Sequence, residues 1–311
     1  YYYCQRARFC KSDFNAFSTS RSTDGSFSDY RLLCTSQLPV EASEYLTLCV
    51  NRCRNYTLPE LENSVELRTT RRLTVASGNV TSFDAPLIAA FGRLSYLEVW
   101  PQRSRSVDRF FVPPYLRTLI LRRTGVHELD ILPDAAYQLR VLYAADNRLT
   151  DVSQLHRLRA LQQLNLNNNK LRQLSWTAFD GLDELRELSL RGNGLSVIDG
   201  VVPGVQLPLR KLVRLNLSNN RLRRLDVELW NMDRLELLEL EGNSLEQVGS
   251  SLVRLQALKK LSLRDNRWDC VWLNRTLQWM EGRRIQLVGG IDFACPSPGS
   301  ARVGGKLCCV K

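Results

Sequence analysis

A pattern of eleven residues, L-x-x-L-x-L-x-x-N-x-L, recurs along this chain and constrains its fold more than any other feature of the sequence. Successive copies start 22 to 27 residues apart, which is the period expected of a small coil that stacks on its neighbours. Part of the pattern also occurs earlier in the chain, as a degenerate tenth copy with Leu46, Leu48, Asn51 and Cys53. The nine regular copies start at Thr70, Leu94, Leu116, Leu139, Leu161, Leu185, Leu212, Leu235 and Leu258.

The spacing inside the pattern predicts which side chains face the core. Residues of a strand alternate between two faces, so we expect Leu164 and Leu166 inside and Asn165 on the concave surface. The asparagine at position nine, such as Asn169, can hydrogen-bond backbone groups of adjacent coils. One coil cannot bury its leucines alone, but a stack can. The sequence therefore predicts a leucine-rich repeat solenoid, or horseshoe, with a parallel β-sheet on the concave face and short helices and loops on the convex side.

Segments between the copies predict the convex side and the domain limits. Apolar residues in 151–160 and 173–182 indicate short convex helices or turns. The longest step contains Gly200, Pro203, Gly204 and Pro208, which predict an irregular loop. We expect a cysteine-containing N-terminal cap with a degenerate repeat over residues 1–69, nine repeats over 70–268, and a helical C-terminal cap with a double cysteine over 269–311.

The cysteines lie only toward the two ends of the chain. A solenoid exposes its core at both ends unless capped, so this distribution predicts disulfide-stapled caps in an oxidising, extracellular compartment. The odd count leaves one thiol that is reduced or bonded to another chain, so a disulfide-linked or non-covalent dimer stays open. Bonds within the C-terminal group are expected to join Cys270 to Cys308 or Cys309, and Cys295 to the other. The nine are Cys4, Cys10, Cys34, Cys49 and Cys53, then Cys270, Cys295, Cys308 and Cys309.

Four N-glycosylation sequons fit an extracellular location, at Asn55, Asn79, Asn216 and Asn274. Asn216 is the most consequential, because it falls between two leucines on a concave strand. A glycan there would obstruct the centre of the concave face and direct recognition to the N-terminal coils or to an edge.

Composition and motifs exclude several classes of function. The net charge of +11, from 43 basic and 32 acidic residues, favours acidic partners such as sulfated glycans. The basic residues are spread along the chain without a nucleic-acid module, so no nucleic-acid partner is expected. No run approaches 18 apolar residues, so we expect no membrane span in this chain. Paired C-x-x-C and nucleotide motifs are absent, and His127 and His156 lie outside the expected strands, which predicts no enzyme, cofactor or metal site.

The C-terminal cap resembles those of known extracellular proteins. Asn266, Trp268 and Cys270 resemble the entry to a leucine-rich C-terminal cap, with a helix at about 271–282. The order Cys270, Cys295, Cys308-Cys309 resembles the leucine-rich repeat immune molecules of mosquitoes, which include the Anopheles-Plasmodium-responsive leucine-rich repeat proteins. This resemblance implies secretion into haemolymph and an innate immune role, in which some members, as disulfide-linked pairs, hold a complement-like thioester protein until it reaches a pathogen surface.

Alternation along the early strands predicts where a protein partner binds. Aromatic and aliphatic side chains fall at outward positions of three successive coils, and such a patch marks an interaction site. Trp100, next to Pro101, turns inward in the alternative interpretation. Two alternative functions are also compatible with the sequence: a matrix or adhesion module that binds sulfated glycans, and a receptor ectodomain. The predicted patch consists of Tyr96, Trp100, Ile120, Val141 and Tyr143.

Overall fold

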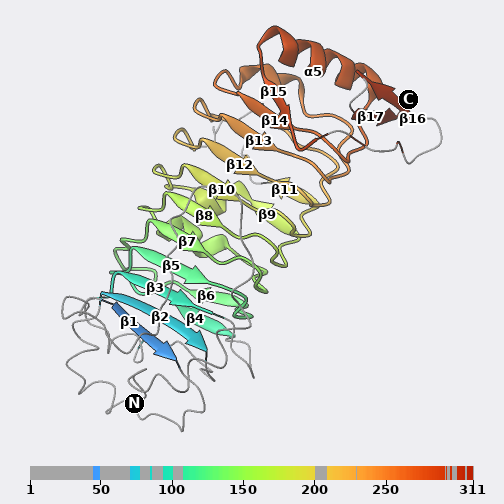
Figure 1. Ribbon diagram of the computed structural model, residues 1–311. Helices are drawn as coiled ribbons and strands as arrows, with labels where there is room; N and C mark the ends of the chain where they lie inside the picture. The colour runs from blue at the N-terminus through green and yellow to red at the C-terminus, as the bar shows by residue number, and fades with distance from the viewer. Residues whose placement is uncertain are drawn as a thin grey trace, which may run out of the picture.

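The computed structural model is a solenoid of stacked coils (Figure 1). It describes residues 45–49, 71–77, 85, 94–100, 108–199, 209–228, 230–290, 292, 295, 300–304 and 307–310. Residues 45–49, 74–77 and 250–251 are described by their backbone only. Outside the described residues lie the predicted loop over 200–208 and several residues predicted as disulfide or glycan sites: Cys4, Cys10, Cys34, Cys53, Asn55 and Asn79.

One strand of each coil joins a main sheet of eleven strands, in which every neighbouring pair is parallel. The strands follow one another in chain order, so each coil packs on the one before it. They are β1 (Tyr45–Cys49), β2 (Arg72–Ser77), β3 (Tyr96–Val99), β5 (Thr118–Leu121), β7 (Val141–Tyr143), β8 (Gln163–Asn165), β10 (Glu187–Ser189), β12 (Arg214–Asn216), β13 (Leu237–Glu239), β14 (Lys260–Ser262) and β15 (Gln286–Val288).

The N-terminal end of this sheet contains residues of the degenerate copy, whereas its C-terminal end contains a strand that the sequence analysis did not predict. At the N-terminal end, β1 contains Leu46 and Leu48 of the degenerate copy, which align with Leu73 and Val75 of β2. At the other end, β15 lies within the predicted cap and was not foreseen. Its Leu287 aligns with Leu261 of β14, so one further coil continues the sheet after the last recognisable copy of the pattern.

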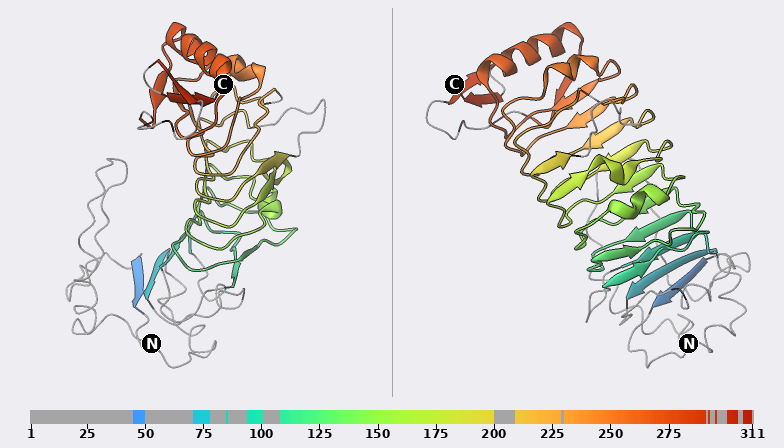
Figure 2. Two further views of the ribbon diagram at one scale, coloured as in Figure 1. Left: turned by 90° about the vertical axis from the view of Figure 1, so that its right-hand side faces the viewer. Right: turned by 180° about the vertical axis from the view of Figure 1, so that it is seen from behind.

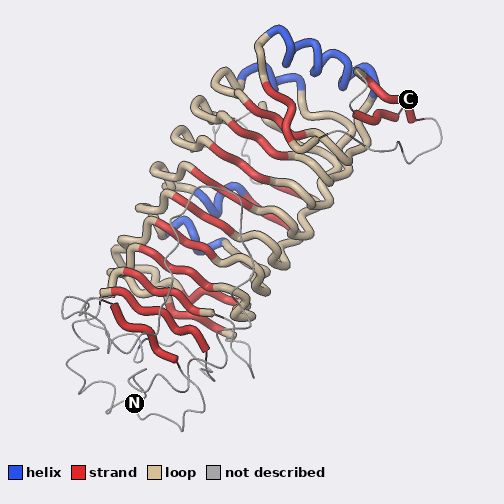
Figure 3. The backbone as a smooth tube through the Cα atoms, in the orientation of Figure 1, coloured by secondary structure: helices blue, strands red, loops and turns tan. Residues whose placement is uncertain are grey.

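Opposite the main sheet, short elements close each coil (Figure 2). Two pairs of parallel strands lie there: β4 (Arg109–Phe111) with β6 (Glu128–Asp130), and β9 (Gln173–Ser175) with β11 (Val197–Asp199). The helices are single 3₁₀ turns, η2 (Ser153–Arg157), η3 (Trp176–Phe179) and η4 (Ser250–Arg254). Figure 3 shows how little helix the coils contain. The segment over 173–182, predicted as a helix or turn, begins instead with strand β9.

The pattern leucines form one continuous core. Leu164 and Leu166 are 1% and 0% exposed, whereas Asn165 between them is half-buried on the concave face, which confirms the predicted alternation. On the convex side Trp176 packs edge-on against Trp230, with ring centroids 5.5 Å apart. This aromatic pair joins two coils and seals the core where the strands are short.

Position nine of the pattern forms a ladder of buried amides. Asn169 donates from Nδ2 to the carbonyls of Ala144 (2.8 Å) and Leu166 (2.9 Å), and its Oδ1 accepts from the N–H of Leu149 (3.0 Å). The predicted role of this position is confirmed, because each amide satisfies backbone groups of two coils that would otherwise be buried without partners. Related bonds are made by Asn147, Asn193, Asn220, Asn243 and Asn266.

Position eight adopts left-handed backbone, as at Asn168 (φ 54°) and Gly192 (φ 67°). We predict that Gly192→Ala destabilises the fold by about 1–3 kcal/mol, because its Cβ meets Asn168 Oδ1 in a conformation that L-residues avoid. Gly194 is the matched control, since its added Cβ stands 3.5 Å from the carbonyl of Leu171 at a permitted φ. Gly194→Ala should change stability by less than about 0.5 kcal/mol. Equal losses in chemical denaturation would contradict this account.

The C-terminal end is closed by helix α5 (Cys270–Gly282) and an antiparallel hairpin, β16 (Ser300–Val303) with β17 (Leu307–Val310). The side chain of Asp269 caps α5 by accepting from the N–H of Trp272 (2.7 Å), and the helix buries Leu273 and Met280. No helix in the described part of the chain has the length and apolar character that crossing a membrane requires.

Two disulfides tie this cap together, Cys270–Cys309 and Cys295–Cys308. This is one of the two pairings that the sequence left open. The first bond links the start of α5 to β17, and Cys309 is only 1% exposed. The adjacent cysteines therefore serve two separate bonds, one to the helix and one to the segment before the hairpin.

Candidate binding face

The concave side of the sheet is the broad surface that the coils build from outward side chains. In the N-terminal coils, register places Tyr96, Thr118 and Val141 in one row across β3, β5 and β7. A second row contains Glu98, Ile120 and Tyr143. The sheet thus brings together residues up to 47 positions apart in sequence, as the alternation predicted for this part of the face.

The five predicted patch residues share an intermediate degree of burial. Tyr96, Ile120, Val141 and Tyr143 are half-buried, whereas the leucines between them point inward and are fully buried. Trp100 follows β3 and is also half-buried, next to the fully buried Val99. We call these five residues the concave patch. Its role in binding stays a prediction.

A buried polar group divides the concave patch, which the sequence analysis missed. Glu98 is only 8% exposed; its carboxylate accepts from the hydroxyl of Tyr96 (3.0 Å) and lies 2.9 Å from Nε of Arg122. The guanidinium of Arg72 stacks over the Tyr96 ring at 4.4 Å. The patch therefore combines aromatic surface with an ordered cation–carboxylate network. Aligning outward positions of neighbouring copies would have placed Glu98 beside Ile120.

The two tyrosines of the patch are held in fixed orientations. Burial, followed by the charge and the hydrogen bond of Glu98, raises the pKa of Tyr96 to about 12. Burial also raises the pKa of Tyr143, whose hydroxyl donates to Oε1 of Gln163 (3.3 Å). Both side chains stay neutral at physiological pH. A rigid, neutral tyrosine loses little entropy on binding, which suits it to a protein interface.

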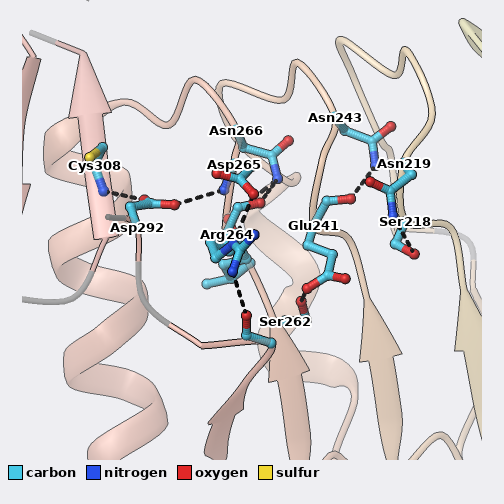
Figure 4. Close-up of polar contacts among 12 residues, drawn as sticks. Ser218, Asn219, Glu241, Asn243, Ser262, Arg264, Asp265, Asn266, Asp292 and Cys308 are labelled. Atoms are coloured by element: carbon cyan, nitrogen blue, oxygen red, sulfur yellow. Dashed lines mark hydrogen bonds and ion pairs between the residues drawn. The ribbon is translucent and has the colours of Figure 1, made fainter. Parts of the chain in front are cut away.

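The C-terminal half of the concave face is polar. Burial, and after it the charge of Glu241, raises the pKa of Glu239 on β13, and Arg191 and Arg214 oppose that rise. Glu241 accepts from the hydroxyl of Ser262 (3.1 Å), as Figure 4 shows. These groups bond mainly to one another, so they form a satisfied polar surface and not an apolar docking surface.

A row of turns runs beside this surface, and the last turn is bonded to the buried carboxylate of Asp292. In the earlier coils the N–H groups of Asn219 and Gly242 donate to backbone carbonyls of the next coil. At the last such turn Asp292, only 4% exposed, replaces the carbonyl: it accepts from the N–H of Asp265 (2.9 Å) and of Cys308 (2.6 Å) (Figure 4). This side chain thereby joins the coil ladder to the disulfide-bonded hairpin.

Two of the predicted glycan sites fall within the described chain. Asn274 is exposed on α5. Asn216 lies half-buried on β12, where its Oδ1 accepts from the N–H (2.9 Å) and the hydroxyl (2.7 Å) of Ser218 in the same sequon. Asn216 thus belongs to a strand of the main sheet, between Ser189 of β10 and Glu239 of β13. Glycan occupancy at either residue stays a prediction.

Neither histidine lies on the concave strands. His127 Nδ1 is 2.8 Å from the carboxylate of Asp108 near the convex strands β4 and β6, and His156 in η2 contacts the carbonyl of Ser153 at 2.6 Å. Over the described residues, no three His, Cys, Asp or Glu side chains are placed to hold a metal ion.

Comparison with known proteins agrees with this architecture. Residues 137–195 match the family model described as Leucine rich repeat, and residues 211–232 match a second model, Leucine Rich Repeat. Together with the parallel sheet and the amide ladder, these matches settle the class of fold. By fold, this is a leucine-rich repeat domain.

Related sequences share parts of this domain with longer proteins. The domain is 32% identical over 140 residues to Transforming growth factor beta activator LRRC33 of Danio rerio, covering 43% of this chain and 20% of that protein. It is 34% identical over 156 residues to Podocan-like protein 1 of Mus musculus, covering 49% and 27%. A third match, 36% over 140 residues, is Geranylgeranyl transferase type-2 subunit alpha of Pongo abelii, covering 44% and 24%. The domain thus spans about a quarter or less of these relatives.

Solved structures share the fold at low sequence identity. The LRIM1/APL1C complex superposes with a TM-score of 0.58 at 23% identity, covering 78% of this chain and 46% of that one. The APL1 leucine-rich repeat domain gives 0.56 at 20% identity, covering 86% and 78%. The likeness is one of fold, and it extends over most of the repeat domain.

Proposed function

We propose that this leucine-rich repeat domain is a secreted, non-enzymatic scaffold that binds a protein partner through the concave patch. The observation that carries the proposal is that Tyr96, Ile120 and Tyr143 lie on three consecutive strands, with Ile120 aligned to Tyr143 and Tyr96 in the neighbouring row. Trp100 follows the first of these strands. Tyrosine and tryptophan supply most of the energy of protein interfaces when they are rigid and partly desolvated. The two cap disulfides support an oxidising, extracellular location.

We further propose an innate immune role for this scaffold, with a complement-like thioester protein or a pathogen surface as its partner. The fold shared with the LRIM1/APL1C complex and the order of the cap cysteines support this choice. That neighbour was solved as a complex of two leucine-rich repeat proteins, which also supports a dimer for this domain. The proposed immune role implies that the protein acts in haemolymph.

Binding to a purified complement-like thioester protein tests the proposal. We predict that Trp100→Ala and Tyr143→Ala each weaken binding by roughly 5-fold to 30-fold or more, since interface aromatics contribute about 1–2 kcal/mol or more. Leu237→Ala is the matched control, because Leu237 is an apolar, half-buried residue at the same pattern position as Val141, on β13. It should leave binding within about twofold.

Surface plasmon resonance measures the binding affinity of each variant, and only variants with unchanged thermal unfolding are compared. If both aromatic variants bind as the unsubstituted protein does, the concave patch is not the binding site. If the protein fails to bind but retains its fold, the immune partner is wrong, while the assignment of a leucine-rich repeat scaffold stands.

A further inference from the structure

The side of the solenoid at which the concave strands end carries a column of cations that form no ion pair among the described residues. In the coils that start at Leu139, Leu161 and Leu212, positions ten and twelve of the pattern flank the buried leucine of position eleven and are exposed. Backbone hydrogen bonds connect these positions in successive coils: the N–H of Arg221 donates to the carbonyl of Leu195 (2.8 Å), and the N–H of Ser196 donates to the carbonyl of Arg172 (3.0 Å). Sequence analysis treated these basic residues as spread out, whereas the coiled fold gathers them.

Four of these cations flank a coil whose own residues at positions ten and twelve are small. Lys170 and Arg172 belong to the coil before it, Arg221 and Arg223 to the coil after it, and all four are exposed. We call them the basic quartet. The intervening coil presents Gly194 and Ser196, and the stem of Arg172 lies 3.9 Å from the place that a Cβ on Gly194 would take. Successive coils are roughly 4.8 Å apart, so the two pairs of cations, which lie two coils apart, are separated by about 10 Å.

Carboxylates lie near the basic quartet, but among the described residues none forms an ion pair with it. Of the flanking acids, Asp146 is held by Asn168 (2.8 Å), and Asp151 accepts from Ser153 (2.8 Å). Glu246 is exposed one coil beyond Arg223. The column continues through Arg148 on one side, so positive charge extends along the stack.

We propose that the basic quartet binds a sulfated polysaccharide that runs along the solenoid, at a site separate from the concave patch. Arginine guanidinium groups bind tetrahedral oxyanions through paired N–H groups, and an extended chain with regularly spaced sulfates matches cations repeated from coil to coil. Other polyanions fit less well. Positions ten and twelve over these coils carry no aromatic side chain on which bases would stack and no apolar side chain that would enter a lipid surface.

Heparin binding, measured by calorimetry over a range of salt concentrations, tests the inference. We compare the unsubstituted protein with a variant carrying Lys170→Ser, Arg172→Ser, Arg221→Ser and Arg223→Ser. Its affinity should fall by about tenfold or more, and the slope of log K against log salt should shrink by about one for each lost contact. A matched control removes the same charge from dispersed exposed sites: Arg140→Ser, Arg159→Ser, Arg234→Ser and Arg275→Ser. It should retain most of the affinity.

A second variant tests the same site in case the fourfold variant misfolds. Ser196→Glu places one carboxylate in the middle of the basic quartet on an exposed side chain, and it should also weaken heparin binding. Equal losses in the quartet variant and the dispersed control would overturn the proposal. Equal binding to desulfated heparin would also overturn it, because the sulfates would then contribute nothing. So would equal binding to duplex DNA or to phosphatidylserine vesicles, because the site would then select for charge alone.

Discussion

Asn220→Ala is expected to lower the free energy of unfolding by about 3 kcal/mol, because it strips partners from several buried backbone groups at once. The amide donates to the carbonyls of Leu190 (3.0 Å) and Leu217 (3.0 Å) and accepts from the N–H of Leu195 (3.2 Å). Asn220 is only 8% exposed, so bulk water has little access to the backbone groups that lose these bonds. Chemical denaturation followed by circular dichroism measures the loss.

Two matched variants separate this explanation from a general cost of losing an amide. Asn165→Ala removes a half-buried concave amide that accepts one bond, from the N–H of Asn167 (3.0 Å), and should cost less than about 1 kcal/mol. Asn220→Thr should fall between the two, because Thr124 occupies the same pattern position naturally and donates to Asn147 (2.9 Å). Equal costs for the two alanine variants would show that the ladder contributes little.

Removing the bond between Cys270 and Cys309, with both residues changed to alanine, is expected to cost about 4 kcal/mol. The chain-entropy estimate gives this value for a separation of 39 residues. Without the bond, α5 can leave the last coil and expose Leu273, Met280 and the stacked pair of Trp268 and Trp272, whose centroids are 4.6 Å apart. We therefore expect aggregation, preceded by a tryptophan fluorescence change at low denaturant.

The second cap disulfide is the comparison. Cys295–Cys308 closes a shorter loop, with a separation of 13 residues, for which the same estimate gives about 3 kcal/mol. Its loss should loosen the segment before the hairpin while α5 stays attached through Cys309. An unchanged unfolding midpoint after loss of Cys270–Cys309, or peptide mapping that links Cys270 to Cys295, would refute this view of the cap.

Much of the fold was predictable because the pattern is local and repeated. The alternation of Leu164, Asn165 and Leu166 sets the two faces of a strand, and the amide at Asn169 sets the turn, whatever lies elsewhere in the chain. For the same reason the rows of the concave patch followed from counting pattern positions. The degenerate first copy was recognisable because Leu46 and Leu48 preserve the alternation.

Elements without a repeated signature were not predictable. Strand β15 carries only Leu287 at a core position, so its place in the sheet depends on packing against β14 and α5. Strand β9 was missed because three residues are too few to show a period. Asp292 gave no signal, since its partners Asp265 and Cys308 are 27 and 16 residues away.

The repeat pattern was sufficient to predict the solenoid, its parallel sheet, its leucine core, its amide ladder and the location of the capping cysteines, since each depends on residue type at fixed spacing. The three-dimensional arrangement was needed to show which cysteines pair and how Glu98 and Arg122 divide the concave patch. It was also needed to show how Lys170, Arg172, Arg221 and Arg223 lie around Gly194. Those features depend on the distance between side chains of different coils. That distance is set by how the coils stack, and no single repeat encodes it.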